Sequence, residues 1–234
     1  MGTLFVISTP IGNLKDITYR AVETLQLVDT LAAEDTRHSG RLLKHYNIKT
    51  NLRSFHEFNK EKQLPFLLHE LKSGKNVGII TDAGTPGISD PGFSLIRAAI
   101  ESEISIVPIP GLTAFVPALV VSGLPVHRFV FEGFPPVKKG RKAFFEKLAQ
   151  EERTIILYES PHRLNKTVKE IGEYWGKRQL VIARELTKIF EEFLRGSVDE
   201  VLSEITEKPR KGEIVIVIEG RKPEPRKRKE RNEI

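Results

Sequence analysis

One stretch of the chain has the residue types and spacing of a ligand-binding loop. TDAGTPGISDPG (81–92) follows the apolar run NVGII and contains three glycines, two prolines and two aspartates, Asp82 and Asp90. Glycine permits a ligand to approach the main chain closely, and a carboxylate at a strand end needs a polar partner. A ligand amine or ribose hydroxyl would supply that partner for Asp82. The spacing fits neither the dinucleotide fingerprint nor the Walker phosphate loop, so we expect a different ligand.

Asp90 also has a purely structural interpretation. An aspartate is a favoured helix N-cap, and a proline such as Pro91 is favoured at the first helical position. The sequence therefore predicts that a helix begins directly after the loop, and that its free N–H groups can face a carboxylate or phosphate.

Several other chemistries are excluded by residue types. The chain has no cysteine, which excludes disulfides, thiolate nucleophiles and cysteine-ligated zinc. Its six histidines show no HExxH spacing, so we expect no metal, and no GxSxG elbow of a serine hydrolase occurs. No apolar run reaches the roughly 18 residues that a membrane span requires. We therefore expect a cytoplasmic enzyme or binding protein with no membrane partner.

Positive charge is concentrated in two places. Residues 221–234 carry seven Lys or Arg against three Glu, which leaves only +2 of the total +6 for residues 1–220. Such an arm is usually solvated, but it can also steer the protein towards nucleic acid. The second place is PPVKKGRKAFF (135–145), where four cations precede Phe144 and Phe145. Cations beside aromatic rings suit RNA, although these two rings can instead pack a helix into the core.

The apolar pattern predicts an α/β protein with two domains. In the first half, strands at 3–8, 29–35, 51–55, 76–81 and 105–110 alternate with helices at 16–26, 37–46, 57–73 and 93–102. Asp16 is expected to cap the first helix and Pro65 to interrupt the third. This alternation predicts a parallel sheet covered on both faces. The pattern restarts near 112–125, so the predicted domains are 1–115 and 116–220, followed by the tail 221–234.

The second domain is predicted from a shorter series of elements. Strands are expected at 128–134, 153–159, 179–185 and 213–220, helices at 138–150, 162–175 and 198–205, and an extended arm at 188–197.

Three strands of the first half end in Pro/Gly turns. STPIGN (8–13), the 81–92 loop and PIPGLTA (108–114) each follow a strand and lead towards a helix. In an open parallel sheet such ends line one edge, and ligands bind in the crevice outside them. The residues alone therefore predict a ligand site at this edge.

Seven motifs resemble one known family. TPIGNLKDIT, AAEDTRHSGRLLKHY, TDAGTPGISDPG, PIPGLTA, YESPHR, ARELTK and KGE occur in this order over residues 8–213. Together they are similar to the ribosomal RNA small-subunit methyltransferase I family of the tetrapyrrole-methylase superfold. The resemblance implies two α/β domains with S-adenosylmethionine in a cleft between them, and a homodimer. It implies 2′-O-methylation of a cytidine ribose in 16S rRNA, on free rRNA or the small ribosomal subunit.

The resemblance also implies which residues face the cofactor. They come from the three Pro/Gly loops and, across the cleft, from three segments of the second domain. In this chain they are Pro10, Gly12, Asp82, Ala83, Gly84, Pro86, Gly87, Ile88, Thr113, Ala114, Tyr158, Leu186 and Glu213.

A ribose hydroxyl is a poor nucleophile, so a general base should assist its methylation. EDTRH (34–38) and RELTK (184–188) offer carboxylates, and our candidates are Asp35 and Glu185. Asp35 has a structural alternative, because it can cap the helix that starts near Arg37. The expected RNA contacts are cations of these motifs and of the second domain, namely Arg37, Lys138, Lys139, Arg141, Lys142, Arg163 and Lys211.

Two other functions stay open at this point. One is a methylase that uses the same cofactor on a small, tetrapyrrole-like molecule. The first loop argues against it, because porphyrin-type enzymes carry a Gly-Pro-Gly-Asp turn where this chain has TPIGN. The other is a non-catalytic RNA-binding factor, for which the basic residues would be the whole function.

Overall fold

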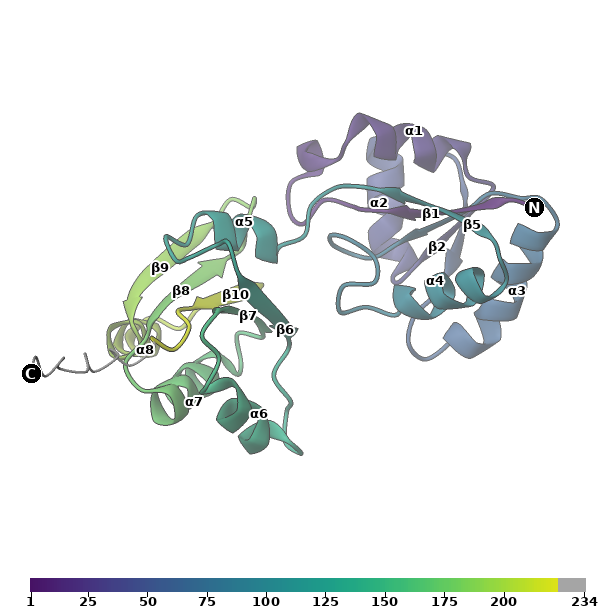
Figure 1. Ribbon diagram of the computed structural model, residues 1–234. Helices are drawn as coiled ribbons and strands as arrows, with labels where there is room; N and C mark the ends of the chain where they lie inside the picture. Colours follow the sequence, from purple (N-terminus) through teal and green to yellow (C-terminus); the bar gives the residue numbers. More distant parts are fainter. Residues whose placement is uncertain (223–234) are drawn as a thin grey trace, which may run out of the picture. The chain divides into compact units, whose positions relative to one another are not determined.

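The computed structural model describes residues 1–222, and the predicted tail from residue 223 onwards lies outside the described part. The chain divides into two compact units (Figure 1). Unit 1 is Met1–Pro117 together with Glu185–Glu191, and unit 2 is Ala118–Arg184 together with the chain from Glu192. The boundary falls inside the short helix α5 (Phe115–Val120). The predicted boundary at residue 115 is close to this position, but the sequence placed 185–191 in the second domain.

Unit 1 contains a parallel five-stranded sheet in the order β3-β2-β4-β1-β5. The strands form where short, largely apolar runs are bounded by polar turns, as the continuous run VGII of β4 illustrates. Their bounds are β1 (Thr3–Ile7), β2 (Thr30–Ala33), β3 (Asn51–Ser54), β4 (Val77–Ile80) and β5 (Ser105–Ile109).

Four helices cover the two faces of this sheet (Figure 1). On one face, α1 (Tyr19–Leu27) and α2 (Thr36–His45) bury Leu25 and Leu43 against the strands. On the other face, α3 (Lys60–Lys72) and α4 (Gly92–Glu101) bury Leu67 and Leu95. Because α1 follows β1 and α4 follows β4, the adjacent strands β1 and β4 lead to helices on opposite faces. This is the topological switch point at which open sheets bind ligands.

Unit 2 contains a mixed sheet in the order β6-β7-β10-β8-β9. Strands β6 and β7 are parallel, whereas β10 is antiparallel to β7 and β8. All three of its helices contribute to one core, in which Phe145, Trp175 and Ile205 pack together. The elements are β6 (Phe129–Gly133), α6 (Arg141–Leu148), β7 (Thr154–Glu159), α7 (Leu164–Trp175), β8 (Gln179–Arg184), β9 (Glu192–Ser197), α8 (Val198–Glu207) and β10 (Ile214–Ile218).

Three local expectations differ from the structure. Asp16 ends a short 3₁₀ turn (Leu14–Asp16), and the cap of α1 is Thr18, whose hydroxyl accepts from Ala21 N. Pro65 does not interrupt α3; it is exposed, so water can serve the Glu61 carbonyl that lacks its usual donor. Most of the predicted extended arm is the edge strand β9, which pairs with β8.

Candidate cofactor and active site

The three Pro/Gly loops meet at one edge of the unit 1 sheet. They follow β4, β1 and β5, which are neighbours in the sheet and run parallel. Thr9 and Gly84 form an isolated bridge with N–H to carbonyl distances of 2.8 and 3.2 Å. The predicted meeting of the loops at this edge is therefore confirmed.

A single hydroxyl connects all three loops. Thr85 Oγ1 lies 2.9 Å from Ser8 Oγ and 2.8 Å from Thr113 Oγ1, and it donates to the Leu112 carbonyl at 2.9 Å. Sequence reasoning did not single out Thr85 or Ser8. The sequence does indicate such a contact, because each of the three Pro/Gly loops contains a serine or a threonine whose hydroxyl can bond to another loop.

The loop after β4 owes its shape to two left-handed glycines and one aspartate. Gly84 and Gly87 have φ values of +89° and +91°, a region that side chains disfavour. Asp90 accepts from Gly87 N at 2.9 Å and from Gly92 N at 2.7 Å. Helix α4 begins at Gly92, so Pro91 is its N-cap rather than its first residue, and Asp90 lies one position before the cap. Asp90 therefore serves to close the loop.

Asp82 and Asp35 are connected to each other. Asp82 Oδ1 accepts from Asp35 N at 3.0 Å, so this predicted cofactor residue has a main-chain partner from the end of β2. Asp35 caps α2 by accepting from Arg37 N at 2.8 Å, and it forms an ion pair with the Arg37 side chain at 3.1 Å. Hydrogen bonds from Arg37 lower the pKa of Asp35 to about 2. The structural alternative for Asp35 is thus confirmed, and a carboxylate with this pKa is a weak base.

Glu34 has the opposite electrostatic environment. It is half-buried at the end of β2, and its Oε2 accepts from Thr81 Oγ1 at 3.0 Å. Burial raises the pKa of Glu34, and the charges of Asp82 and Asp90 raise it further, while the Thr81 hydrogen bond lowers it. The sequence placed Glu34 in the same motif as Asp35 but did not select it. The burial of Glu34 depends on contact with Thr81, which is distant in the sequence. A local sequence pattern therefore cannot show it.

The segment Glu185–Glu191 lies with unit 1 rather than in the second domain. A Cβ atom at Gly12 would come within 2.8 Å of the Leu186 carbonyl oxygen and 2.4 Å of Lys188 Cγ. Leu186 is buried, and Glu185, with φ at +50°, forms an ion pair with Lys188 at 2.9 Å. The absence of a side chain at Gly12 therefore allows the first loop to pack closely against Leu186 and Lys188. The sequence analysis placed Leu186 in the second domain, and this is wrong, because Leu186 lies in unit 1. Its contact with the cofactor stays a prediction.

The remaining predicted cofactor residues differ in exposure. Tyr158 is half-buried on β7, with its ring 4.9 Å from that of Phe131, and Glu213 is exposed just before β10. Their contact with a cofactor stays a prediction. In unit 1, Pro10 and Pro86 are buried. Thr113 and Ala114 of the third loop are half-buried, whereas Ala83 and Ile88 of the second loop are exposed.

The loop after β3 presents an exposed aromatic ring at the same edge as the loop after β2, because β2 and β3 are parallel. Phe58 is 96% exposed. The loop below it is held by Asn59, which donates to the Ser54 carbonyl at 3.3 Å and accepts from His56 N at 2.9 Å. An exposed ring on a loop held in this way is suited to stacking on a nucleobase. The sequence analysis did not identify it, because exposure cannot be read from a single phenylalanine.

The structure contradicts two of the predicted RNA contacts. Arg141 is 4% exposed, and its guanidinium donates to Glu170 Oε2 at 2.6 Å and to Thr167 Oγ1 at 2.6 Å. Arg163 forms an ion pair with buried Glu159 at 2.7 Å and donates to the Pro135 carbonyl. Both side chains hold the structure together and are not free for phosphate. The exposed members of the set are Arg37, Lys138, Lys139, Lys142 and Lys211.

Residues 1–222 contain no group of three or more His, Cys, Asp or Glu side chains that could hold a metal ion. None of the helices in this described part is long and apolar enough to cross a membrane.

Comparison with solved structures shows the fold. The uroporphyrin-III-C-methyltransferase of Thermus thermophilus superposes with a TM-score of 0.67 at 19% identity, covering 93% of this chain and 94% of that one. The methyltransferase CobJ gives a TM-score of 0.71 at 16% identity, covering 95% and 97%. Residues 3–202 match the family model of the Tetrapyrrole (Corrin/Porphyrin) Methylases. The chain is thus a methyltransferase with the two-domain tetrapyrrole-methylase fold, which confirms the predicted fold class.

Proteins of similar sequence identify the family within this class of methyltransferases. Proteins named ribosomal RNA small subunit methyltransferase I from Synechocystis and from Streptococcus pyogenes serotype M1 are 51% and 49% identical to this chain. The first alignment covers 97% of this chain and 82% of the relative, and the second covers 94% and 77%. A Haemophilus influenzae protein of the same name is 46% identical over 94% of this chain and 79% of its own length. The chain belongs to the ribosomal RNA small subunit methyltransferase I family.

Proposed function

We propose that this protein transfers a methyl group from S-adenosylmethionine to the ribose 2′-oxygen of a cytidine in 16S rRNA. The observation that carries the proposal is the near 50% identity, over almost the whole chain, to proteins whose name specifies small-subunit ribosomal RNA. The exposed ring of Phe58 and the exposed cations of unit 1 and unit 2 support a nucleic-acid substrate. The predicted homodimer remains part of this proposal.

The loops at the unit 1 edge fit S-adenosylmethionine. The cofactor carries amino and sulfonium cations and a ribose diol, and the edge offers the carboxylate of Asp82. Gly84 and Gly87 carry no β-carbon, and both have a left-handed backbone conformation that shapes the second loop. When bound, the cofactor supplies an electrophilic methyl group whose leaving group is a neutral thioether.

The protein's contribution is alignment and proton removal. Positioning of the hydroxyl against the methyl carbon can supply about 7–11 kcal/mol of the barrier. The hydroxyl proton needs an acceptor, and a general base works best when its pKa lies near the working pH. Glu34, whose pKa is raised by burial, meets this condition better than Asp35, whose pKa is about 2. We therefore assign the base to Glu34, with Glu185 as the remaining candidate.

One assay separates the proposal from both alternatives. Purified protein is incubated with cofactor labelled in the methyl group and with small ribosomal subunits or 16S rRNA that lack the modification. Label in the cytidine ribose supports the proposal. Cofactor binding without label in RNA would favour a small-molecule methylase, and RNA binding without cofactor binding would favour a non-catalytic factor.

The shape of the 81–92 loop gives a test of the cofactor site. Gly87→Ala is expected to weaken S-adenosylmethionine binding by about 5- to 30-fold, measured by calorimetry. The left-handed backbone at φ +91° carries a strain of roughly 1–2 kcal/mol with a side chain, and the loop relieves this strain by leaving its binding shape.

Gly74→Ala is the matched control for this loop. Gly74 has a φ of +94°, and a Cβ there would meet no atom within 4 Å. It lies in the turn before β4, at the other end of that strand. The two variants should lose similar stability, but only Gly87→Ala should lose cofactor affinity. Equal cofactor affinity in both variants would remove the loop from the site.

The exposed lysines of unit 2 predict how RNA binding depends on salt. Replacing Lys138, Lys139 and Lys142 together with Gln should flatten the slope of log affinity against log salt by about 2 to 3, since each lost phosphate contact contributes about 0.7–0.9. Arg141 is left in place because it is buried. The Lys→Arg triple variant keeps the charge and should keep the slope. A parental slope for the Gln variant would show that RNA contacts other residues.

A further inference from the structure

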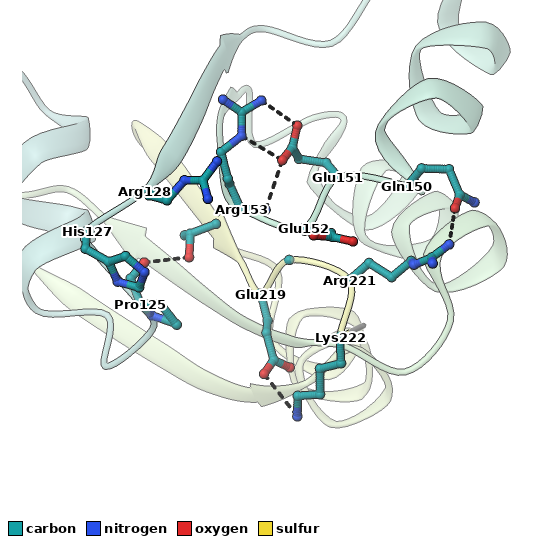
Figure 2. Close-up of a pocket in the computed structure, with 12 residues that line it drawn as sticks. Pro125, His127, Arg128, Gln150, Glu151, Glu152, Arg153, Glu219, Arg221 and Lys222 are labelled. Carbon is teal, nitrogen blue, oxygen red and sulfur yellow. Dashed lines mark hydrogen bonds and ion pairs between the residues drawn. The ribbon is translucent and has the colours of Figure 1, made fainter. Parts of the chain in front are cut away.

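A pocket lies at the edge of the unit 2 sheet where β6 and β7 begin (Figure 2). It has a volume of about 650 Å³ and is lined by the segments before β6 and β7 and by the chain after β10. Because β10 is antiparallel to β7, its end lies beside the start of β7. Lys138 and Lys139 follow the other end of β6, so this pocket is separate from that cluster.

Cations outnumber carboxylates around this pocket. The lining contains Arg128, Arg153, Arg221 and Lys222 against Glu151, Glu152 and Glu219. In the view of Figure 2, Arg128 and Arg153 lie on one side of the hollow, and Arg221 and Lys222 on the other. A further charge is buried next to it: Arg178 is 5% exposed and donates to the carbonyls of Ala149 and Glu219. A buried charge acts on a neighbouring ligand with little screening by water.

Some of these side chains are already paired, and others are not. Arg153 forms an ion pair with Glu151 at 2.8 Å, and Lys222 forms one with Glu219 at 3.0 Å. Arg221 donates to the Gln150 side chain. Within residues 1–222, Arg128, His127 and Glu152 have no side-chain hydrogen bond or ion pair, and all three are exposed. The pocket thus offers one unpaired guanidinium, one imidazole and one carboxylate.

This combination fits one repeating unit of an RNA strand. An arginine guanidinium binds a phosphate through two parallel hydrogen bonds, and a glutamate accepts from the exocyclic amine of a base such as cytosine. The volume lies within the range of about 300–1,000 Å³ that is usual for ligand sites. A surface that presents only phosphates, such as a lipid headgroup layer, would leave Glu152 facing negative charge. Arg221 and Lys222 add two further cations to the lining, and several cations around one pocket suit a polyanion rather than a single anion.

We propose that this pocket is a second RNA-binding site, in which Arg128 binds a backbone phosphate and Glu152 a base amine. It rests on the proposed function for the identity of the RNA. Its role is to hold a part of the substrate that is not being methylated.

The test measures binding of a labelled single-stranded RNA of mixed sequence over a range of salt concentrations. Arg128→Gln should lower the slope of log affinity against log salt by about 0.7, and the affinity by roughly fourfold at about 0.15 M salt. Arg128→Lys keeps the charge and should keep the slope, while losing the paired hydrogen bonds. Arg97→Gln, which removes one exposed charge from α4 of unit 1, is the matched control and should behave as the parent.

The outcomes separate this proposal from the proposed function. Parental slope and affinity for a folded Arg128→Gln protein would overturn the second site, even if the parent methylates rRNA. Loss of RNA binding in Arg128→Gln would support the site, even if no methyl transfer to rRNA is found. A final measurement uses cytidine monophosphate as the ligand. If it binds in this pocket over the same concentration range as RNA and RNA does not displace it, the pocket binds free nucleotides. That result would contradict our assignment.

Discussion

Glu34→Gln is expected to slow single-turnover methyl transfer to rRNA by about 10²–10⁴-fold at saturating cofactor, the usual contribution of a general base. The amide keeps the shape of the side chain and can still accept the hydrogen bond from Thr81, so cofactor affinity should change little. Asp35→Asn is the matched control, because asparagine also caps a helix well and Asp35 is already paired with Arg37. Its rate should stay within a few-fold of the parent.

The pH dependence gives an independent readout. A base must be ionised to act, so the rate of the parent should fall as the pH drops through the pKa of Glu34. That pKa is raised by burial, whereas Asp35, with a pKa of about 2, stays ionised throughout the range and cannot cause the fall. Glu34→Gln should therefore abolish the acidic limb. If Glu34→Gln reacts at the parental rate and Glu185→Gln is slow, the base is Glu185.

Arg141→Met should lower the free energy of unfolding by about 3–5 kcal/mol, measured by urea denaturation. Removing one partner of a buried ion pair leaves the other charge without compensation, and here Glu170 would be left beside α6. The side chain also loses its hydrogen bonds to Thr167 and to the Pro136 carbonyl. The sequence suggested that this arginine contacts RNA, so the variant distinguishes the two roles.

Lys142→Met controls for the loss of a neighbouring charge. Lys142 is 75% exposed and lies 3.7 Å from Glu146, so its removal should cost at most about 1 kcal/mol. A double variant with Glu170→Gln should recover part of the stability lost in Arg141→Met, because the unpaired carboxylate is then absent. Equal stability of the two single variants would contradict the buried network.

Local patterns were sufficient to predict most elements of the fold. Strands such as VGII and IVIVI are short continuous apolar runs, and the turns between elements are marked by Gly, Pro and Asp. The cap at Asp35 was also predictable, because it depends on residues only two positions apart.

What could not be predicted depends on residues that are distant in the sequence. The basic stretch after β6 does not show which of its four cations turns inward, because the partner of Arg141 is Glu170 on another helix. Glu34 is half-buried against the loop after β4, where it accepts from Thr81, whereas Asp35 is paired with Arg37. The shared hydroxyl of Thr85 likewise joins three segments that no window of sequence contains together.

The membership of Glu185–Glu191 in unit 1 has a consequence for synthesis of the chain. Gly12 packs against Leu186 and Lys188, so the first loop of the amino-terminal unit lacks its neighbours until the ribosome has made most of unit 2. Domains usually fold in the order in which they are made. In this protein the sheet of unit 1 can form early, but the edge that carries the first loop is completed late. A nascent chain stopped before residue 185 would therefore carry a folded sheet whose first loop lacks its packing partners.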